Sequence, residues 1–495
     1  MADQSSAANE HKIDIEYFER PDVKGFDEIF SKYKSSTLIS NQQAEWPKIP
    51  KVSKMLRNLD KNNDCFDPHV VSIGPYHHGK PHLQEVENLK TEMALRYCRR
   101  FPGPGVSDLY KRGFDLYERV KDVASEARGF YDKERLNNID DEAFTKMMFL
   151  DGCFILEFMI MCLPMGEEEY HTNMTANVKR DLFLLENQLP YIVLKELMKG
   201  KDDEKDWKKR IEKFITLCRR LPVKPWQFIN AIEFAHGLSP KDNSPLHLLE
   251  VMRTGFVVQK PTVHGRKAQK LETNGLRGRP DVWFSRYPAR VLKYMGIPFG
   301  PNKTAFDWYS YHPARVLKSM GIRFRPNKTG SFSDIKFESC LLVRGVLTLP
   351  PIRIDGTTKS LLLNLLALES SHTNLADMRG VVTSYMCFMD SLIDNADDVM
   401  ILRSQNIIVN CLGTDQDVAD LFNNIASNLV PNPRIYDVAK HGIQKHCESK
   451  FKKWMAEFHR IHFRNPWTLF ALFGSLLLAT LTVTQTYLAA MQLEQ

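Results

Sequence analysis

Apolar residues recur at three- and four-residue spacing through most of the chain, which is typical of helices that pack one face on a core. This spacing predicts helices at 86–97, 108–133, 144–163, 180–198, 206–220, 360–369, 377–394 and 414–429. The segment 144–163 is almost wholly apolar, but Lys146, Asp151 and Glu157 would place charge in mid-bilayer if it crossed a membrane. We therefore interpret it as a buried central helix.

Alternation with a period of two appears in one region only. Residues 332–337 (FSDIKF) alternate, residues 345–349 (GVLTL) follow, and Pro350 and Pro351 halt the pattern before 352–354. These features predict a small β hairpin or sheet within 332–355. The expected fold class is mainly α with this small β element, as a large helical body at 14–464 plus one C-terminal transmembrane helix.

The end of the chain predicts that membrane helix. No charged side chain occurs from Asn465 to Leu493, and a helix over 467–491 would be ~37 Å long. The hydrocarbon core of a bilayer is about 30 Å thick. Trp467 and Tyr487 stand where interfacial aromatic residues are expected. A buried amphipathic helix is the alternative, but the segment has no polar face to turn toward water.

Charge around the predicted span sets its orientation. Only Glu494 follows it, whereas five basic residues precede it: Lys450, Lys452, Lys453, Arg460 and Arg464. Because positive flanks stay on the cytosolic side, we expect a single-pass, tail-anchored protein with a cytosolic body, in the plasma membrane or an endomembrane. Residues 1–13 are expected to form a flexible leader without a secretory signal. Glycan at Asn173, Asn302 or Asn327 would contradict this orientation.

The segment 434–464 before the span is basic and has apolar residues at helical spacing. Two interpretations use the same residues. The helix could lie against anionic lipid headgroups, or its apolar stripe could pack on the body as a stalk. The pattern does not choose between them.

The net charge of +7 is distributed unevenly. Residues 259–330 contain fifteen Lys and Arg against three acids, a balance of +12, so the rest of the chain has a balance of −5. One atypical segment therefore makes the chain basic, and no nucleic-acid partner is expected. Within that segment, 288–304 recurs as 313–329 with fourteen of seventeen residues identical. We expect only one copy to occupy the place that a single-copy fold provides.

Motifs for common chemistries are missing from the sequence. It contains no phosphate-binding G-x-x-x-x-G-K-[ST] loop, no H-E-x-x-H and no G-x-S-x-G, and its nine cysteines never form C-x-x-C. His77, His78 and His82 are close in sequence, but Gly79 and Pro81 prevent the helix that would align two of them. We expect a loop with solvated or capping histidines, and no cofactor, metal or small-molecule ligand is inferred.

Other polar residues have two possible interpretations. Asp151, Glu157 and Glu186 lie in apolar runs and could have shifted pKa values, but buried partners for arginine or backbone amides are the simpler role. The basic segment 206–220 could contact calmodulin or lipid, or could be a surface helix that packs Trp207 and Phe214 inward.

Several runs together resemble a plant family called domain of unknown function 247. They are VSIGPYHHG at 71–79, DGCFILE at 151–157, DLFLLENQLP at 181–190, LPPIRID at 349–355, and further runs at 332–337, 383–394, 407–413, 417–422 and 465–467. The motif positions taken as candidate site residues are Gly74, Pro75, Tyr76, His77, His78, Gly79, Asp151, Gly152, Glu157, Glu186, Asn187, Gln188, Pro190, Pro350 and Pro351.

The resemblance implies a plant-restricted, mostly helical protein that ends in one membrane span. No enzymatic activity is established for such proteins, and some are associated with pollen self-incompatibility in grasses, which suggests recognition. This chain departs from the family pattern at 288–304, which looks like an insertion, and at 338–344, which is longer than the turn expected there.

Two functions follow as expectations. The first is a membrane-anchored, non-enzymatic recognition or scaffold protein, with the lipid bilayer and an unidentified protein as partners. The alternative is a membrane-bound enzyme whose site is assembled from dispersed acidic and histidine residues, around Asp151, Glu186 and the histidine loop. Convergence of those side chains in a pocket, with their charges unpaired, would favour the enzyme.

Overall fold

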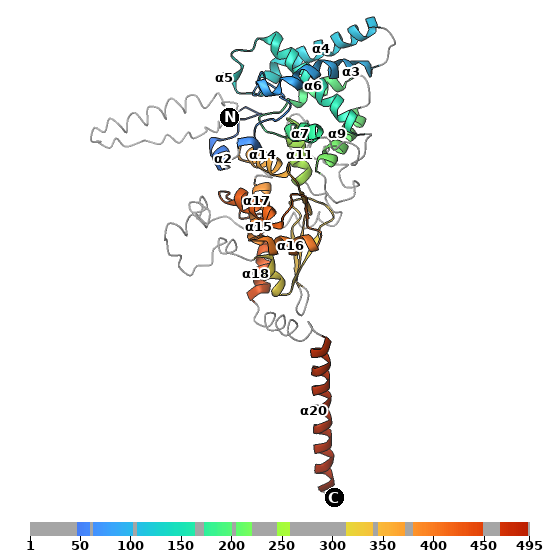
Figure 1. Cartoon of the computed structure of the whole chain (residues 1–495), viewed down its shortest axis with the longest axis vertical. Coiled ribbons are helices and arrows are strands. Elements are labelled where there is room, and N and C mark those ends of the chain that lie inside the picture. The colour runs from blue at the N-terminus through green and yellow to red at the C-terminus, as the bar shows by residue number, and fades with distance from the viewer. Residues whose placement is uncertain are drawn as a thin grey trace, which may run out of the picture. The chain divides into compact units, whose positions relative to one another are not determined.

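The computed structural model of the chain describes residues 47–59, 63–101, 106–163, 173–199, 204–219, 245–257, 313–339, 345–371, 380–448 and 466–493 (Figure 1). Its α-helices are α2 (Lys54–Leu59), α3 (Gln84–Arg99), α4 (Val106–Arg128), α5 (Lys133–Leu136), α6 (Asp141–Cys162), α7 (Asn173–Asp181), α8 (Tyr191–Met198), α9 (Glu204–Arg219), α11 (Leu248–Val257), α13 (Ala314–Ser319), α14 (Thr358–Ser370), α15 (Val381–Leu392), α16 (Ala396–Ser404), α17 (Asp415–Ala426), α18 (Asp437–Glu448) and α20 (Pro466–Leu493). Two short 3₁₀ helices are η2 (Asn63–Cys65) and η3 (Pro81–Leu83).

The strands are short: β1 (Ile322–Pro326), β2 (Lys336–Ser339), β3 (Gly345–Leu349), β4 (Ile352–Ile354) and β5 (Ile408–Asn410). The expected class, mainly α with a small β element, is therefore confirmed for the described residues.

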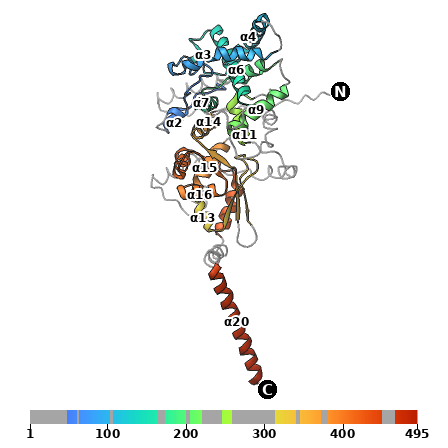
Figure 2. The same cartoon turned by 45° about the vertical axis from the view of Figure 1, so that its right-hand side comes forward.

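Helix α6 is the centre of the first group of helices. It is apolar on every face, and α3, α4, α8 and α9 all pack against it, so that α3, α4 and α6 lie together in both views (Figures 1 and 2). Met148, Leu156 and Met159 are fully buried. Asp140 caps its first turn, accepting a hydrogen bond from the Ala143 amide at 2.7 Å. The central buried helix expected at 144–163 is confirmed.

Helix α14 joins the N-terminal half of the body to the C-terminal half. It contacts η2 and α11 on one side and α15 and β4 on the other. Its Asn364 side chain is fully buried. The Asn364 Oδ1 accepts from the Leu185 amide at 2.8 Å, and its Nδ2 donates to the Cys65 carbonyl at 2.9 Å. One amide on α14 therefore connects two segments that are far apart in the sequence.

The β element differs from the prediction. Strand β3 lies between β1 and β2, pairing parallel with β1 and antiparallel with β2, while β4 and β5 form a separate parallel pair. Strands β1 and β5 lie outside the predicted region 332–355, and only Lys336 and Phe337 of the run 332–337 enter a strand, β2. The expected hairpin corresponds to β2 and β3. Strands of three to five residues are too short for alternation to reveal them.

The helix predicted at 180–198 is wrong in its middle. Helix α7 ends at Asp181 and α8 begins at Tyr191, directly after Pro190. Between them the buried side chains of Asn187 and Gln188 bind backbone groups that a continuous helix would have paired internally. Apolar spacing alone could not reveal this competition.

Of the two interpretations of 206–220, the surface helix that packs Trp207 and Phe214 inward is confirmed. On α9, Trp207, Ile211 and Phe214 are buried, so its apolar face packs on the body and is not available to calmodulin or lipid. At the start of α17, Thr414 and Asp417 form a reciprocal capping box.

Helix α18 packs against β2, and its Ile443 and Cys447 are buried. This favours packing on the body for 437–448, whereas 449–465, with the basic flank residues, lies outside the described residues. The leader at 1–13 and the first repeat copy at 288–304 also lie outside them. Helix α20 has 28 residues. Judged on the residues that the structure describes, none of the helices combines the length and the apolar character needed to cross a membrane.

Candidate functional site

The segment 67–80, here named the motif loop, is held by side chains from elsewhere in the chain. The carboxylate of Asp181 is fully buried. It accepts hydrogen bonds from the backbone amides of His69, Val70 and Val71, the shortest being 2.8 Å from Val70. Arg180 Nη1 lies 2.8 Å from the same carboxylate. Burial raises the pKa of Asp181, although these hydrogen bonds and Arg180 oppose the shift.

Asn187 and Gln188 of the 181–190 motif continue this scaffold. Asn187 Oδ1 accepts from the Ile73 amide at 2.7 Å, and its Nδ2 donates to the Val71 carbonyl at 3.0 Å. Gln188 Nε2 donates to backbone carbonyls of its own segment, and its Oε1 accepts from the Leu249 amide at 2.9 Å. Both side chains are about 1% exposed, so these bonds replace water that the groups have lost.

Gly74 lies where the motif loop approaches α6 most closely. Its amide donates to Asp151 Oδ2 at 2.7 Å. Its φ is +72°, and a Cβ there would lie 2.8 Å from the hydroxyl of Tyr131 and 3.0 Å from the Gln188 carbonyl. Glycine is therefore required at this position for both conformation and space.

The other oxygen of Asp151 binds a buried lysine. Lys90 on α3 is 1% exposed, and its Nζ lies 2.6 Å from Asp151 Oδ1 and 2.5 Å from Glu87 Oε1. Lys90 also donates to the Ser72 carbonyl at 2.6 Å. Burial raises the pKa of Asp151, and the positive charge of Lys90 partly reverses the shift. The aspartate is thus bound from both sides.

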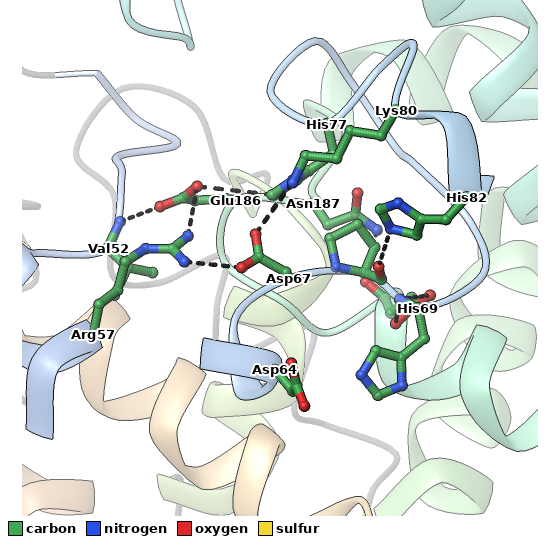
Figure 3. A network of polar contacts seen from close by, with 12 residues as sticks. Val52, Arg57, Asp64, Asp67, His69, His77, Lys80, His82, Glu186 and Asn187 are labelled. Atoms are coloured by element: carbon green, nitrogen blue, oxygen red, sulfur yellow. Dashed lines mark hydrogen bonds and ion pairs between the residues drawn. The ribbon is translucent and has the colours of Figure 1, made fainter. Parts of the chain in front are cut away.

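Where the two ends of the motif loop meet, five charged or titratable residues form what we name the charge cluster (Figure 3): Arg57, Asp67, His77, Lys80 and Glu186. Arg57 bridges two carboxylates, with Nη1 3.2 Å from Asp67 Oδ2 and Nη2 3.0 Å from Glu186 Oε2. Lys80 Nζ lies 3.4 Å from Asp67 Oδ1. Burial raises the pKa of Asp67, but attraction to Arg57 and Lys80 outweighs it, so the net pKa is lowered.

His77 lies between the two carboxylates of the cluster. Its Nδ1 is 3.6 Å from Asp67 and its Nε2 is 3.8 Å from Glu186, and neither nitrogen has a hydrogen-bond partner among the described residues. Burial, aided by Lys80, lowers the pKa of His77 to about 4. The imidazole is therefore neutral at neutral pH. The expectation that this histidine is solvated is wrong, because the loop folds it inward to 3% exposure.

The tip of the motif loop faces solvent. The His78 side chain is 45% exposed, Gly79 has open space around it, and His82 is exposed with its Nε2 3.2 Å from the Pro68 carbonyl. No three histidine, cysteine or acidic side chains come together as metal ligands within the described part of the chain.

The remaining motif positions have separate places. Tyr76 donates to the Ile49 carbonyl at 2.8 Å. Glu157 forms a bidentate pair with Arg100 at 2.5 and 2.6 Å, and this partner does not belong to the motif loop. Gly152 leaves space for Leu197, which would lie 2.4 Å from an added Cβ. Four prolines occupy connections: Pro75 lies in the loop, Pro190 precedes α8, and Pro350 with Pro351 separates β3 from β4.

Sequence reasoning missed Arg57, Asp67 and Lys90. Lys90 was detectable, because it occupies an apolar position of the helical pattern that contains Val86 and Tyr97. Arg57 and Asp67 carry no such signal, since nothing local shows that they meet Glu186.

Asp151 and Glu186 have separate sets of partners: Asp151 binds the middle of the motif loop at Gly74, whereas Glu186 contacts Arg57 and His77 in the charge cluster. Asp151 is compensated by Lys90 and a backbone amide. Glu186 is compensated by Arg57, and its Oε1 accepts from the Val52 amide at 2.7 Å. Carboxylates bound in this way position a backbone and have little capacity for acid–base catalysis.

Two plant proteins are similar to this chain over most of its length. The chain is 28% identical over 450 residues to the UPF0481 protein At3g47200 of Arabidopsis thaliana, covering 86% of this chain and 83% of the relative. It is 22% identical over 475 residues to the putative UPF0481 protein At3g02645 of the same plant, covering 86% and 87%. No solved structure matches the chain. The family model described as plant protein of unknown function matches residues 49–481, and the chain therefore belongs to this family, domain of unknown function 247.

Proposed function

We propose that this chain is a single-pass membrane protein, anchored by α20, whose helical body recognises a protein partner and does not catalyse a reaction. The observation that carries the proposal is the character of α20. Its apolar side chains are exposed, and the hydroxyls among them are bound to its own backbone.

The exposure on α20 is extensive. Phe470, Phe473, Leu477, Leu478 and Val483 are between 63% and 69% exposed. Burying one such side chain is worth about 1.5 to 3 kcal/mol, so leaving them all in water would be costly. Contiguous apolar surface of this kind is typical of a surface that contacts protein or lipid.

The polar groups of α20 favour lipid as the contact. Four threonine hydroxyls donate to carbonyls three or four residues earlier, at 2.6 to 2.8 Å: Thr480, Thr482, Thr484 and Thr486. A hydroxyl in hydrocarbon finds no water, so it must be satisfied within the helix. These bonds meet that requirement.

The side chains that the structure describes on α20 lie between 470 and 486. The sequence shows that the apolar character continues on both sides of them. It has no charged residue from Asn465 to Leu493, and five basic residues stand between Lys450 and Arg464. A basic flank on one side supports a cytosolic body.

The motif loop supports recognition over catalysis. Its buried anchors are compensated, while His78 and Gly79 at its tip are exposed. A loop whose backbone is fixed by buried carboxylates loses little entropy on binding, which favours a contact surface.

Alkaline carbonate extraction of cell membranes tests the anchor. The intact chain should stay in the membrane pellet. Leu477→Lys with Leu481→Lys should move it to the supernatant, because each charge at a span centre costs roughly 2.5 to 3.5 kcal/mol. The matched control, Leu477→Ala with Leu481→Ala, should remain in the pellet. Extraction of the unaltered chain would overturn the anchor.

Crosslinking in native membranes tests the recognition surface. A protein partner enriched by the intact chain should be lost with His78→Ala. It should be kept with His441→Ala, which alters another exposed histidine outside the motif loop, 71% exposed. Enrichment of no partner, or equal enrichment with both variants, would refute recognition by the motif loop.

A further inference from the structure

The chain contains two copies of one segment, and the structure places the second in the core. Residues 313–329 contain α13 and β1, whereas 288–304 carry nearly the same sequence. The question is what selects 313–329 for this position.

Buried side chains do not distinguish the copies. In 313–329 the buried residues are Pro313, Ala314, Leu317, Ile322, Phe324 and Asn327. The first copy has the same residue at each of these positions. The three differences fall at Ser319, Arg323 and Arg325, all of which are exposed. Either copy would therefore supply an identical set of core contacts.

Among the polar contacts of this segment, one depends on a residue that differs: Ser319 Oγ donates to the Val316 carbonyl at 2.8 Å, and the first copy has Tyr294 there. The others use residues that both copies share. The Arg315 amide donates to the buried Asp398 at 2.9 Å, and its guanidinium lies 2.8 Å from Asp394. The first copy has Arg290 at the matching position. Asn327 Oδ1 accepts from the Gly330 amide at 2.8 Å, and the first copy has Asn302 at the matching position. Gly330 itself belongs to the chain that follows the repeat, where the first copy is followed by Ala305.

The backbone does distinguish them. In the parallel pair, the Gly345 amide donates to the Gly321 carbonyl at 3.2 Å, and the Asn327 amide donates to the Leu349 carbonyl at 2.7 Å. Along a parallel strand, every second residue hydrogen-bonds to a given neighbouring strand. These two bonds therefore show that residues 321, 323, 325 and 327 are the ones that bond to β3. The amides of Arg323 and Arg325 must then point toward β3.

At the position of Arg323 the first copy has Pro298, which has no N–H. Proline is tolerated on an edge strand only where the N–H would face solvent. Here it would face the Gly345 carbonyl, its partner in the ladder, and leave that carbonyl unpaired.

We infer that the backbone N–H of Arg323 decides which copy forms β1. The sequence thus carries, at 288–304, the same residues at the core positions of α13 and β1, but with Pro298 where the N–H of Arg323 faces β3. Within the repeated seventeen residues, this proline is the difference that removes a hydrogen-bond donor from the ladder.

Two matched deletions in the full chain test the inference. Deleting 288–312 joins Tyr287 to the second copy, and deleting 305–329 joins the first copy to Gly330. Both remove 25 residues, and the products differ only where Ser319, Arg323 and Arg325 are replaced by Tyr294, Pro298 and Gly300. The thermal unfolding midpoint of each purified chain is measured in detergent micelles.

The chain lacking 288–312 should unfold at the temperature of the intact protein. The chain lacking 305–329 should unfold several degrees lower or fail to fold, and Pro298→Arg in that background should restore it. Gly300→Arg should restore less, because it returns a side chain but no hydrogen-bond donor. Equal midpoints for the two deletions, or rescue by Gly300→Arg as large as by Pro298→Arg, would overturn the inference.

Discussion

Buried carboxylates and amides in this protein serve mainly to bind backbone. Asp181 alone accepts from three consecutive amides, and Asn187 both accepts from and donates to the motif loop. Hydrogen bonds from amides stabilise the charge of a buried carboxylate. In return, the carboxylate fixes the backbone of a loop that has no secondary structure of its own.

A comparison of Gly74 with Gly79 distinguishes the effect of steric crowding from the effect of backbone conformation. Both have positive φ, +72° and +79°, but only Gly74 is crowded, by Tyr131 and Gln188. We expect Gly74→Ala to lower the free energy of unfolding by about 3 kcal/mol or more, and Gly79→Ala by about 1 to 2 kcal/mol. Denaturant unfolding of both variants measures the difference. Equal losses would show that the close approach at Gly74 relaxes without cost.

His77 should make stability depend on pH. Its pKa is about 4 in the folded chain against 6.5 unfolded, so the unfolded chain binds more protons between these values. Stability is therefore complete above pH 6.5 and falls as the pH decreases toward 4, by about 2 kcal/mol between pH 7 and 5.

His77→Gln removes this titration. Urea unfolding at pH 7, 6 and 5 should show a shallower fall in the free energy of unfolding for the variant than for the unaltered chain. Parallel pH profiles would mean that His77 has the same proton affinity in both states.

At the scale of elements, the contact between α3 and α6 depends on one buried ion pair as well as on apolar packing. Lys90 and Asp151 are both about 1% exposed, and Asp151 also holds the motif loop through Gly74. Such a pair contributes little net stability relative to apolar residues, but removing one partner leaves a buried charge.

Lys90→Met should therefore lower the free energy of unfolding by about 3 to 5 kcal/mol at pH 8. The deficit should shrink toward pH 4, because protonation of Asp151 removes the uncompensated charge. Lys121→Met is the control, since Lys121 is 58% exposed and its pair with Glu118 should contribute under 1 kcal/mol. A deficit that is independent of pH would indicate lost packing and no buried charge.

At the scale of the whole molecule, the proposed membrane orientation would decide which compartment meets the motif loop. Two of the three glycosylation sequons lie in described residues. They differ in whether they could report the side of the membrane on which the body lies. Asn173 is exposed at the start of α7. Asn327 is 6% exposed, and its Nδ2 donates to the Asp334 carbonyl at 2.9 Å, so it could not carry glycan in the folded body.

With a cytosolic body, Asn173 should carry no glycan in cells. An acceptor sequon appended after Gln495 should be glycosylated, because that end would emerge on the lumenal side. Mobility on gels before and after endoglycosidase treatment measures both sites. A shift that depends on Asn173 would reverse the orientation.

The sequence by itself determined the mainly helical class and the buried helix α6, and it offered the inward face of α9 as one of two interpretations. Each depends on residues within a few positions of one another, where helical geometry is local. The uncharged stretch at 465–493 is likewise a property of sequence alone, and its membrane role stays a prediction.

Only the tertiary structure decided the motif loop and the sheet. Lys90 meets Asp151 across 61 residues, and Val52 meets Glu186 across 134, so no local pattern could pair them. The break between α7 and α8 arises because side chains there bind a distant loop. Strand β1 was missed because five residues gain their strand character from pairing with β3, and that pairing depends on a backbone N–H that periodicity does not reveal.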